Sequence, residues 1–445
     1  MPSEQIQLED NLILRAGTAN DAERTIELNR IVHGNPEKNE PSDEVALWTA
    51  DLFAGYNKAI GPSDFTIVED TSTGEIVSTI CLMSQVWNIG GIDTPMGMPE
   101  IVGTHPDYRR RGLVRKQFDL MHKWSADRGQ LFNTIMGIPN YYRQFGYEYA
   151  IDAYGGSMTP LELLKQVSLK DDEQVPFTAR DAERSDAQFI AEIYKNIHER
   201  GFVSVNRSPE IIEKELFECS EGSAFNWRAR ILEIEGTPVA VYMYGLEKMG
   251  EKGIRVDVFE IDSSVNWLDA SKSMLLDLQT LGKRFISEGK IKAEMFEFSF
   301  SQSHPLYRIY KEPLGMEKKP YAWYVRVGDM PKLLNHLSPL FEKRLADSEL
   351  RGWSGDVSIS FYNDGVSLSF DSGKLKSVES TGYIERSDAS AHYPELTFLQ
   401  ALFGKRSFSE LRDLHNDCFA KDHAMGTLQD ILFGGPLASA VLQVS

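Results

Sequence analysis

The sequence predicts a protein of mixed α/β and α+β class with three domains. Residues 1–160 and 161–328 are expected to be tandem domains of one fold, each a mixed, mostly antiparallel sheet flanked by helices. Residues 329–445 are expected to form a smaller α+β domain. Three observations support this division. A chain of 445 residues is too long for one core, a pattern recurs along it, and a new pattern starts near Pro331.

The recurring pattern joins the start of the chain to its middle. Arg15 and Asp21 have the same spacing as Arg180 and Asp186, and a short apolar strand precedes each arginine. The match extends to two further pairs, Ala22 with Ala187 and His33 with His198. About 130 residues after each arginine comes a tyrosine-rich segment with a glycine. This self-similarity indicates a duplicated domain.

Alternating apolar residues and turn signals predict the elements of the first copy. The expected strands are Phe65–Asp70, Glu75–Asn88, Gly97–Thr104 and Leu131–Met136. A helix with Phe118 and Met121 on its apolar face is expected to end at Gly129, a typical C-cap glycine.

The last domain has its own pattern. An amphipathic helix is expected over Met330–Leu345, and two alternating strands, Val357–Phe361 and Val366–Phe370, predict a hairpin around Asp364-Gly365. Helical segments are expected at Glu395–Leu402 and Ser407–Asp417.

The segment Ile101–Arg115 predicts an anion site. A strand-like apolar run meets an arginine-rich turn, and an amphipathic helix follows. The amides of the turn and the N-terminus of the helix converge on one point with partial positive charge. Arg109–Arg111 add charges that can bind phosphate oxygens, and Gly112 lets the main chain approach them closely.

The second copy lacks this turn. At the corresponding place, Val256–Met274, acidic residues replace the arginines and no turn glycine is present. Phosphate would be repelled there, so the second copy is not expected to hold a phosphorylated ligand.

Composition narrows the classes of function. Forty-seven Lys and Arg against 66 Asp and Glu give a formal net charge of −19, which argues against a nucleic-acid partner and favours a cationic ligand. No apolar run is long enough to span a bilayer, and the polar N-terminus is unlike a signal peptide. Cys81, Cys219 and Cys418 are far apart and give no metal-binding spacing. A cytoplasmic protein without a membrane or metal partner is expected.

Two motifs carry a resemblance to a known family. Arg109–Val114, R-x-x-G-x-V, resembles the acetyl-CoA pyrophosphate loop of the GNAT acyltransferases, whose last residue is usually Gly or Ala. Asn140–Tyr147, N-Y-Y-R-Q-F-G-Y, resembles the Y-x-x-x-G-F/Y segment beyond that loop. Taken whole, the chain resembles the enhanced intracellular survival family of bacterial acetyltransferases. The resemblance implies an active N-terminal GNAT domain, a degenerate central one, a sterol-carrier-like C-terminal domain and a homo-oligomer, possibly a hexamer.

The resemblance also implies roles for individual residues. Tyr142, four residues before Gly146, would be the general acid that protonates the leaving thiolate, with Tyr141 as its nearest competitor. The C-terminal carboxylate of Ser445 would take the proton of the amine, and Glu100 is the rival base. The residues expected to contact acetyl-CoA are Val102, Gly103, Thr104, Arg110, Arg111, Gly112, Leu113, Val114, Arg115, Gly137 and Ile138. No metal is needed, because the thioester is already activated.

The sequence thus favours an acetyl-CoA-dependent N-acetyltransferase that acts by direct transfer on a primary amine. The acceptor would be a small molecule or peptide, either an aminoglycoside-like polycation or a lysine side chain. The alternative is a lipid-carrier or regulatory binding protein with a vestigial acyl-CoA site. An apolar helix after Pro331 and an apolar C-terminal tail favour that alternative.

Overall fold

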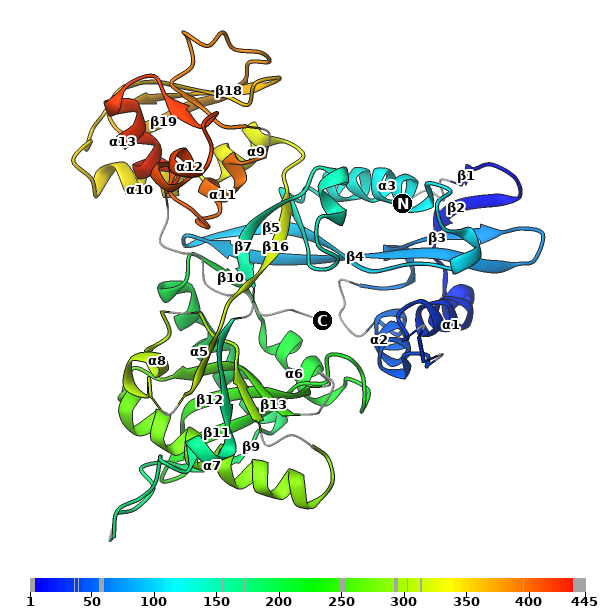
Figure 1. Ribbon diagram of the computed structural model, residues 1–445, viewed down its shortest axis with the longest axis vertical. Helices are drawn as coiled ribbons and strands as arrows, with labels where there is room; N and C mark the ends of the chain where they lie inside the picture. The colour runs from blue at the N-terminus through cyan, green and yellow to red at the C-terminus, as the bar shows by residue number, and fades with distance from the viewer. Residues whose placement is uncertain are drawn as a thin grey trace. The chain divides into compact units, whose positions relative to one another are not determined.

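The computed structural model describes residues 5–35, 37–38, 40–55, 60–153, 155–171, 173–247, 253–291, 295–301, 303–312, 314–394 and 396–434. These residues form two compact units (Figure 1). Unit 1 contains the described residues up to 152 and from 322 onward, and unit 2 contains those from 153 to 321. Within this described part, no helix combines the length and the apolar character needed to cross a bilayer.

Unit 1 has a large sheet that carries the segments singled out above. Its strand order is β1 (Ile6–Gln7), β2 (Leu12–Ala16), β3 (Phe65–Asp70), β4 (Glu75–Ile89), β5 (Ile92–Thr104), β6 (Phe132–Ile135), β16 (Tyr321–Arg326) and β7 (Glu148–Ala153). Strands β1 to β5 are antiparallel in succession, β6 and β16 are antiparallel, and β5 and β6 are parallel. Helices α1 (Ala22–Val32) and α2 (Asp43–Phe53) cover one face, and α3 (Leu113–Asp127) covers the other (Figure 1).

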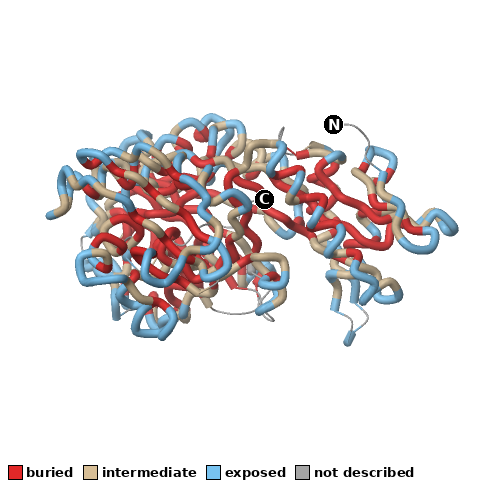
Figure 2. The backbone as a smooth tube through the Cα atoms, turned by 90° about the horizontal axis from the view of Figure 1, so that it is seen from above, coloured by how far each residue is buried: buried red, intermediate tan, exposed pale blue. Residues whose placement is uncertain are grey.

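Helix α3 illustrates why the sequence folds as it does. Phe118 and Met121 are fully buried against the sheet, as their spacing predicts, and apolar burial of this kind stabilises by about 1.5–3 kcal/mol per side chain. Gly129 has φ +73°, the left-handed conformation of a C-cap glycine. Figure 2 shows long buried stretches of the backbone inside the molecule, with the exposed stretches mainly at its periphery.

Unit 2 repeats this architecture. Its strand order is β15 (Met316–Lys318), β8 (Gly156–Pro160), β14 (Met295–Phe298), β13 (Gly253–Ile261), β12 (Thr237–Glu247), β11 (Arg228–Ile234) and β9 (Thr178–Asp181), and β13 and β14 are its parallel pair. The remaining elements are α4 (Leu161–Leu164), α5 (Ala187–Arg200), β10 (Val203–Val205), α6 (Pro209–Phe217), α7 (Trp267–Ser287) and α8 (Pro305–Ile309).

The predicted duplication is confirmed by equivalent ion pairs near the N-terminus of each copy. Arg15 contacts Asp21 at 2.8 Å and Arg180 contacts Asp186 at 2.6 Å, and each arginine also pairs with a glutamate on the adjoining strand. One feature was not predicted. The strand beside the parallel pair comes from a distant part of the chain in both sheets, β16 beside β6 and β8 beside β14.

The C-terminal part of unit 1 has a second sheet. Its strand order is β19 (Lys374–Ser380), β18 (Gly365–Asp371), β17 (Gly355–Ser360), β20 (Ala391–His392) and β21 (Phe419–Ala420). Its helices are α9 (Met330–His336), α10 (Ser338–Ala346), α11 (Phe398–Leu402), α12 (Phe408–Leu414) and α13 (His423–Leu432). The predicted hairpin is confirmed as β17 and β18.

The prediction of one continuous helix over Met330–Leu345 is wrong. The segment forms two helices, α9 and α10, separated at Leu337. Pro339 lies in the first turn of α10, where its missing N–H costs nothing, but inside a longer helix the same residue would remove a hydrogen bond.

Candidate active site

The candidate site is a cavity of about 800 Å³ where β5 and β6 diverge. The two strands pair only at Met96–Phe132 and Gly97–Asn133, and β5 then continues to Thr104 without β6 beside it. Residues after the last pair on both strands line the cavity, and so do residues from α1, α2 and the start of α3. Helix α3 and the α1–α2 pair lie on opposite faces of the sheet (Figure 1). Because residues of all three helices line the cavity, it connects the two faces.

Strand β5 is irregular where it lines the cavity. Thr79 pairs with Gly103 and Cys81 with Glu100, so that Ile101 and Val102 together oppose one residue of β4. Ile101 has φ +51°, a strained conformation for a β-branched residue. A β-bulge of this kind takes backbone groups out of the ladder and redirects the strand. The bulge is therefore at the point where a bound ligand would meet the free edge of β5.

Gly103 is required for the packing of α1 against β5. A Cβ at Gly103 would lie 2.6 Å from Cγ2 of Val32 and 3.4 Å from Nε2 of His33. The glycine therefore allows the end of α1 to lie against β5 and bring His33 to the cavity.

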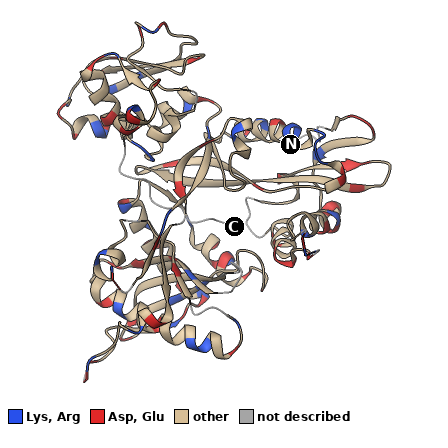
Figure 3. Ribbon diagram, viewed as in Figure 1, with Lys and Arg blue, Asp and Glu red and all other residues tan. Residues whose placement is uncertain are grey.

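The arginine-rich turn has the geometry of an anion site. Arg110 and Gly112 have φ +65° and +72°, and left-handed residues in a turn orient successive amides toward one side. Among the described residues, the amides from Arg110 to Arg115 have no hydrogen-bond acceptor, as is usual at the start of a helix. In Figure 3 the ribbon of α3, which begins at this turn, carries several segments coloured for Lys and Arg.

The arginine side chains of the turn differ in how free they are to bind a phosphate. Arg110 lines the cavity and has no hydrogen-bond or ion-pair partner among the described residues. Arg109 donates to the carbonyl of Thr104 at 3.2 Å, and Arg115 donates to the side chain of Gln144 at 2.9 Å. Arg111 lies over the ring of Tyr108 and 3.6 Å from Asp10. Arg110 is thus the side chain best placed to bind phosphate.

Tyr142 lines the cavity beside the start of α3. It belongs to the short helix η4 (Tyr141–Phe145), whose flanking residues Asn140 and Gly146 are both left-handed. Its ring packs against Phe118 and is 5 % exposed. A Cβ at Gly137 would lie 3.2 Å from the Tyr142 hydroxyl, so the phenol lies directly beside the end of β6.

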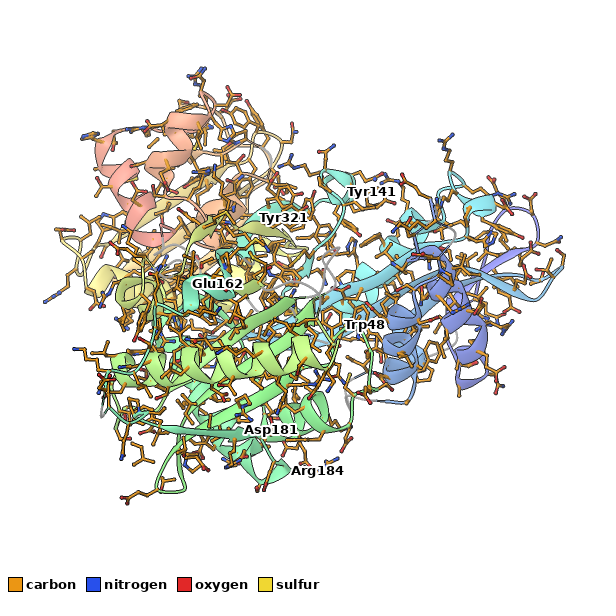
Figure 4. The ribbon with its side chains drawn as sticks, turned by 60° about the horizontal axis from the view of Figure 1, so that its bottom comes forward. Trp48, Tyr141, Glu162, Asp181, Arg184 and Tyr321 are labelled. Carbon is orange, nitrogen blue, oxygen red and sulfur yellow. The ribbon has the colours of Figure 1, made fainter. Side chains whose placement is uncertain are left out.

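Tyr141 also lines the cavity but is less buried (Figure 4). Burial raises the pKa of Tyr141, and Arg115 opposes this effect. Both adjacent tyrosines therefore have access to a ligand in the cavity.

The third wall comes from α1, α2 and the inner part of β5. This wall is formed by Val32, His33, Val45 and Trp48. Glu100 of β5 also lines the cavity and is buried. Figure 4 shows Trp48 on α2. His33 keeps solvent access, but the protein atoms packed around its ring partly desolvate the imidazole and lower its pKa, so the ring is neutral at pH 7. These helix residues carried no motif in the sequence, and only His33 had been singled out, as part of the repeat.

The structure brings most of the predicted site residues together. The predicted coenzyme contacts that line the cavity are Val102, Gly103, Thr104, Arg110, Gly112, Leu113, Val114, Arg115, Gly137 and Ile138. Tyr142 and Glu100 line it as well, whereas Arg111 does not. Ser445 lies outside the described residues. Within the described part of the chain, no group of three or more acidic, histidine or cysteine side chains is arranged to hold a metal ion.

Comparisons with known proteins agree with this geometry. Residues 14–150 match the family model described as an acetyltransferase (GNAT) domain. No sequence among curated proteins matches the chain. The chain is therefore an acyltransferase whose first domain has the GNAT fold.

Solved structures share the fold over nearly the full length. A probable N-acyltransferase from Enterococcus faecalis has a TM-score of 0.68 at 14 % identity, covering 98 % of this chain and 100 % of its own. A GCN5-related N-acetyltransferase from Anabaena variabilis has a TM-score of 0.67 at 12 % identity, covering 97 % and 99 %. Eis1 from Mycobacterium abscessus has a TM-score of 0.61 at 14 % identity, covering 96 % and 99 %. The predicted fold class, tandem GNAT-like domains followed by a further α+β domain, is confirmed.

Proposed function

We propose that the protein is an acetyl-CoA-dependent N-acetyltransferase that moves the acetyl group directly to a primary amine. One observation carries the proposal. A single cavity is lined by the turn amides and Arg110 at the start of α3, by Tyr142, by Glu100 of β5 and by a neutral His33 at the end of α1. Acetyl-CoA as co-substrate would supply an activated acyl group and a thiolate leaving group.

The residues present fit acetyl-CoA. The turn amides and Arg110 would bind its pyrophosphate, and the free edge of β5 from Val102 to Thr104 would bind the amides of the pantetheine arm as an added strand would. Gly137 and Ile138 would form the other side of the groove. Arg111 would contribute charge from outside the cavity.

Tyr142 would act as the general acid. A thiol ionises near pKa 8.5 and a phenol near 10, so a phenol can protonate a departing thiolate with little energetic cost. Among the described residues that line the cavity, only Tyr141, Tyr142 and Tyr108 carry a phenol, and Tyr108 donates its hydroxyl hydrogen to Asp70 at 2.8 Å.

The acceptor needs a base, because an alkylamine with a pKa near 10 arrives protonated. Glu100 lies in the cavity and is one candidate. The terminal carboxylate of Ser445 is the other. Two variants test the candidates separately. Glu100→Gln removes the charge of Glu100, and deletion of Ser445 moves the terminal carboxylate to Val444. The variant that lowers kcat without changing the affinity for acetyl-CoA identifies the base.

Titration calorimetry and a thiol-release assay test the proposal. We expect heat on adding acetyl-CoA and amine-dependent release of free CoA. No heat and no thiol release would refute the proposal. Binding without thiol release, over a broad amine panel, would favour a regulatory binding protein with a vestigial site.

The lipid-carrier alternative loses one of its supports. The apolar residues of the expected helix are buried in the core of the C-terminal part: Leu333, Leu334, Leu337, Leu340, Phe341 and Leu345. They are therefore used for packing and do not form a free apolar face. The apolar tail lies outside the described residues.

We further propose membership of the enhanced intracellular survival family, with a sterol-carrier-like C-terminal domain, a cytoplasmic location and a homo-oligomeric, hexameric state. The domain boundaries at 160 and 328 belong to this proposal. Similarity in fold to Eis1 supports the family, and sedimentation analysis of the full chain tests the oligomeric state.

A further inference from the structure

A second cavity in unit 1, of about 320 Å³, lies at the other end of α3 from the arginine-rich turn. The C-terminal half of α3, the first residues of β6 and the segment that connects β16 to α9 form its walls. Among the described residues, none lines both this cavity and the candidate active site. Small-molecule sites have volumes of roughly 300–1,000 Å³, so this cavity is large enough for a small ligand of its own.

Arg326, the last residue of β16, lines this cavity and is half-buried. Its side chain passes Gly146, where a Cβ would lie 3.7 Å from Nε, and ends beside Gly328, where a Cβ would lie 3.1 Å from Nη1. Among the described residues, none forms a hydrogen bond or an ion pair with its guanidinium. Loss of water around the guanidinium lowers the pKa of Arg326. The cavity therefore contains a partly desolvated cation without a bonded acceptor.

Two other arginines of low exposure show the usual arrangement. The side chain of Arg15 is 14 % exposed and pairs with Asp21 at 2.8 Å. The side chain of Arg230 is 10 % exposed and pairs with Asp277 at 2.8 Å. A cation that loses water without gaining an acceptor destabilises the folded state. An anionic ligand in the cavity would give Arg326 the kind of partner that the other two arginines have within the protein.

The surroundings of Arg326 leave its charge uncompensated. His122 lines the cavity, and its Nε2 lies 2.9 Å from the hydroxyl oxygen of Tyr147. Burial, and then the charge of Arg326, lower the pKa of His122 to about 3, so the imidazole is neutral at pH 7. Asp119 is exposed and attracts the guanidinium without forming an ion pair with it. The part of the cavity beside Arg326 therefore keeps a positive potential.

Three other charged side chains line the cavity. Lys332 is exposed in the first turn of α9, and its ammonium has no partner among the described residues. Asp329 caps α9, where its Oδ1 accepts the amide hydrogen of Lys332 at 2.9 Å. Lys123 on α3 is a further cation. Among the described lining residues, positive side chains thus outnumber negative ones.

We propose that this cavity binds a phosphate group, with Arg326 as its main ligand and Lys332 as a second cation. The group would be free phosphate or the phosphate monoester of a small metabolite. A planar guanidinium can form two parallel hydrogen bonds to phosphate oxygens, and two cations suit a dianion better than a monocarboxylate. The cavity is separate from the coenzyme site, so this inference does not depend on the proposed function.

Titration calorimetry with inorganic phosphate and glucose 6-phosphate, in buffer free of phosphate and sulfate, tests the proposal. Arg326→Gln should weaken the binding of both probes at least about tenfold, because it removes a charge-assisted, bidentate contact. It should leave the Kd for acetyl-CoA unchanged. Arg110→Gln is the matched control, because Arg110 lines the coenzyme cavity. The control should weaken acetyl-CoA binding and leave the affinity for the two probes unchanged.

A substitution at Asp329 should strengthen binding. Asparagine caps a helix as well as aspartate does, so Asp329→Asn is expected to fold. Loss of the negative charge should tighten phosphate binding by about threefold, and Lys332→Gln should weaken it by a similar factor. Both side chains are exposed, so solvent and salt screen their effect more strongly than that of Arg326.

The results have distinct meanings. Tighter binding of glucose 6-phosphate than of phosphate supports a metabolite ligand, and the reverse supports the free ion. Absence of heat with both probes at millimolar concentration overturns the proposal. Loss of probe binding in Arg110→Gln alone also overturns it, because the probes would then occupy the coenzyme turn. Failure of acetyl-CoA binding leaves these results unaffected and concerns the proposed function alone.

Two further measurements complete the test. Acetate is expected to bind at least about tenfold more weakly than phosphate, and equal affinities would overturn the choice of a phosphate group. Circular dichroism checks that each variant folds. If Arg326→Gln does not fold, the opposite shifts expected in Asp329→Asn and Lys332→Gln decide the proposal, and unchanged affinity in both overturns it.

Discussion

At the scale of single residues, the two adjacent tyrosines of η4 have different surroundings. Tyr142 is fixed by packing against Phe118 and by its close approach to Gly137, while Tyr141 is only partly buried. A catalytic acid must be held in one position relative to sulfur, and the more deeply buried ring meets that requirement better. The packing thus agrees with the assignment that the resemblance implies.

Replacing Tyr142 by Phe should separate chemistry from binding. We expect Tyr142→Phe to lower kcat about 100-fold, because general acid catalysis contributes a factor of this order, while the Kd for acetyl-CoA stays within about twofold. Steady-state thiol release and calorimetry measure the two quantities. Tyr141→Phe is the matched control and should retain most of the activity. Equal decreases of kcat in both variants would mean that the tyrosines act through packing. A larger decrease in Tyr141→Phe would make Tyr141 the general acid.

At the scale of elements, the sequence predicted the anion turn because its information is local. Arginines, a glycine and an amphipathic helix are contiguous from Arg109 to Asp127, and the turn forms as expected. The bulge at Ile101 could not be predicted in the same way. It depends on how β5 pairs with β4, and an isoleucine gives no local signal for φ +51°. The wall of α1 and α2 was missed because its residues meet β5 only in the folded sheet.

The turn can be tested with two glycines of one helix. Gly112 and Gly129 flank α3, have φ +72° and +73°, and a Cβ at either would meet no protein atom within 4 Å. Alanine at each position should therefore cost a similar free energy of unfolding, about 1 kcal/mol, from the left-handed conformation alone. Only Gly112→Ala should weaken acetyl-CoA binding, by about tenfold, because only that turn faces the phosphates. Calorimetry and urea unfolding measure both effects. Equal affinities in the two variants would exclude the turn as the phosphate site.

At the scale of the whole molecule, the duplication could be predicted from the sequence because a repeated ion pair requires a repeated spacing of charged residues. Arg and Asp six positions apart recur at the start of each copy and form the same contact. The placement of β16 beside β6 in the first sheet, and of β8 beside β14 in the second, leaves no such pattern in the sequence. Strands of five or six residues pair by backbone hydrogen bonds with any suitable edge, so their partners are set by topology and not by composition.

The repeated ion pair also predicts how stability depends on pH. Burial alone would raise the pKa of Asp21, but hydrogen bonds from Arg15 and Thr18 outweigh it and hold the pKa well below its usual range. A hydrogen bond from Arg180 likewise lowers the pKa of Asp186. A carboxyl group whose pKa is depressed in the folded state contributes stability above its unfolded pKa of about 3.9, and that stability is lost as the pH falls below it.

Asp21→Asn and Asp186→Asn should each destabilise the unit that contains the residue. We expect a loss of roughly 3 kcal/mol for Asp21→Asn at pH 7, because removing one partner of a buried pair leaves the other charge uncompensated. The loss for Asp186→Asn should be smaller, since the Arg180 side chain is 32 % exposed and that of Arg15 is 14 % exposed. Urea unfolding at pH 7 and pH 3 measures both, with a separate transition followed for each unit. The difference between wild type and variant should shrink at pH 3, where the wild-type carboxyl becomes increasingly protonated on unfolding. A difference of the same size at both pH values would show that the two carboxylates stabilise the protein through packing and not through their charge.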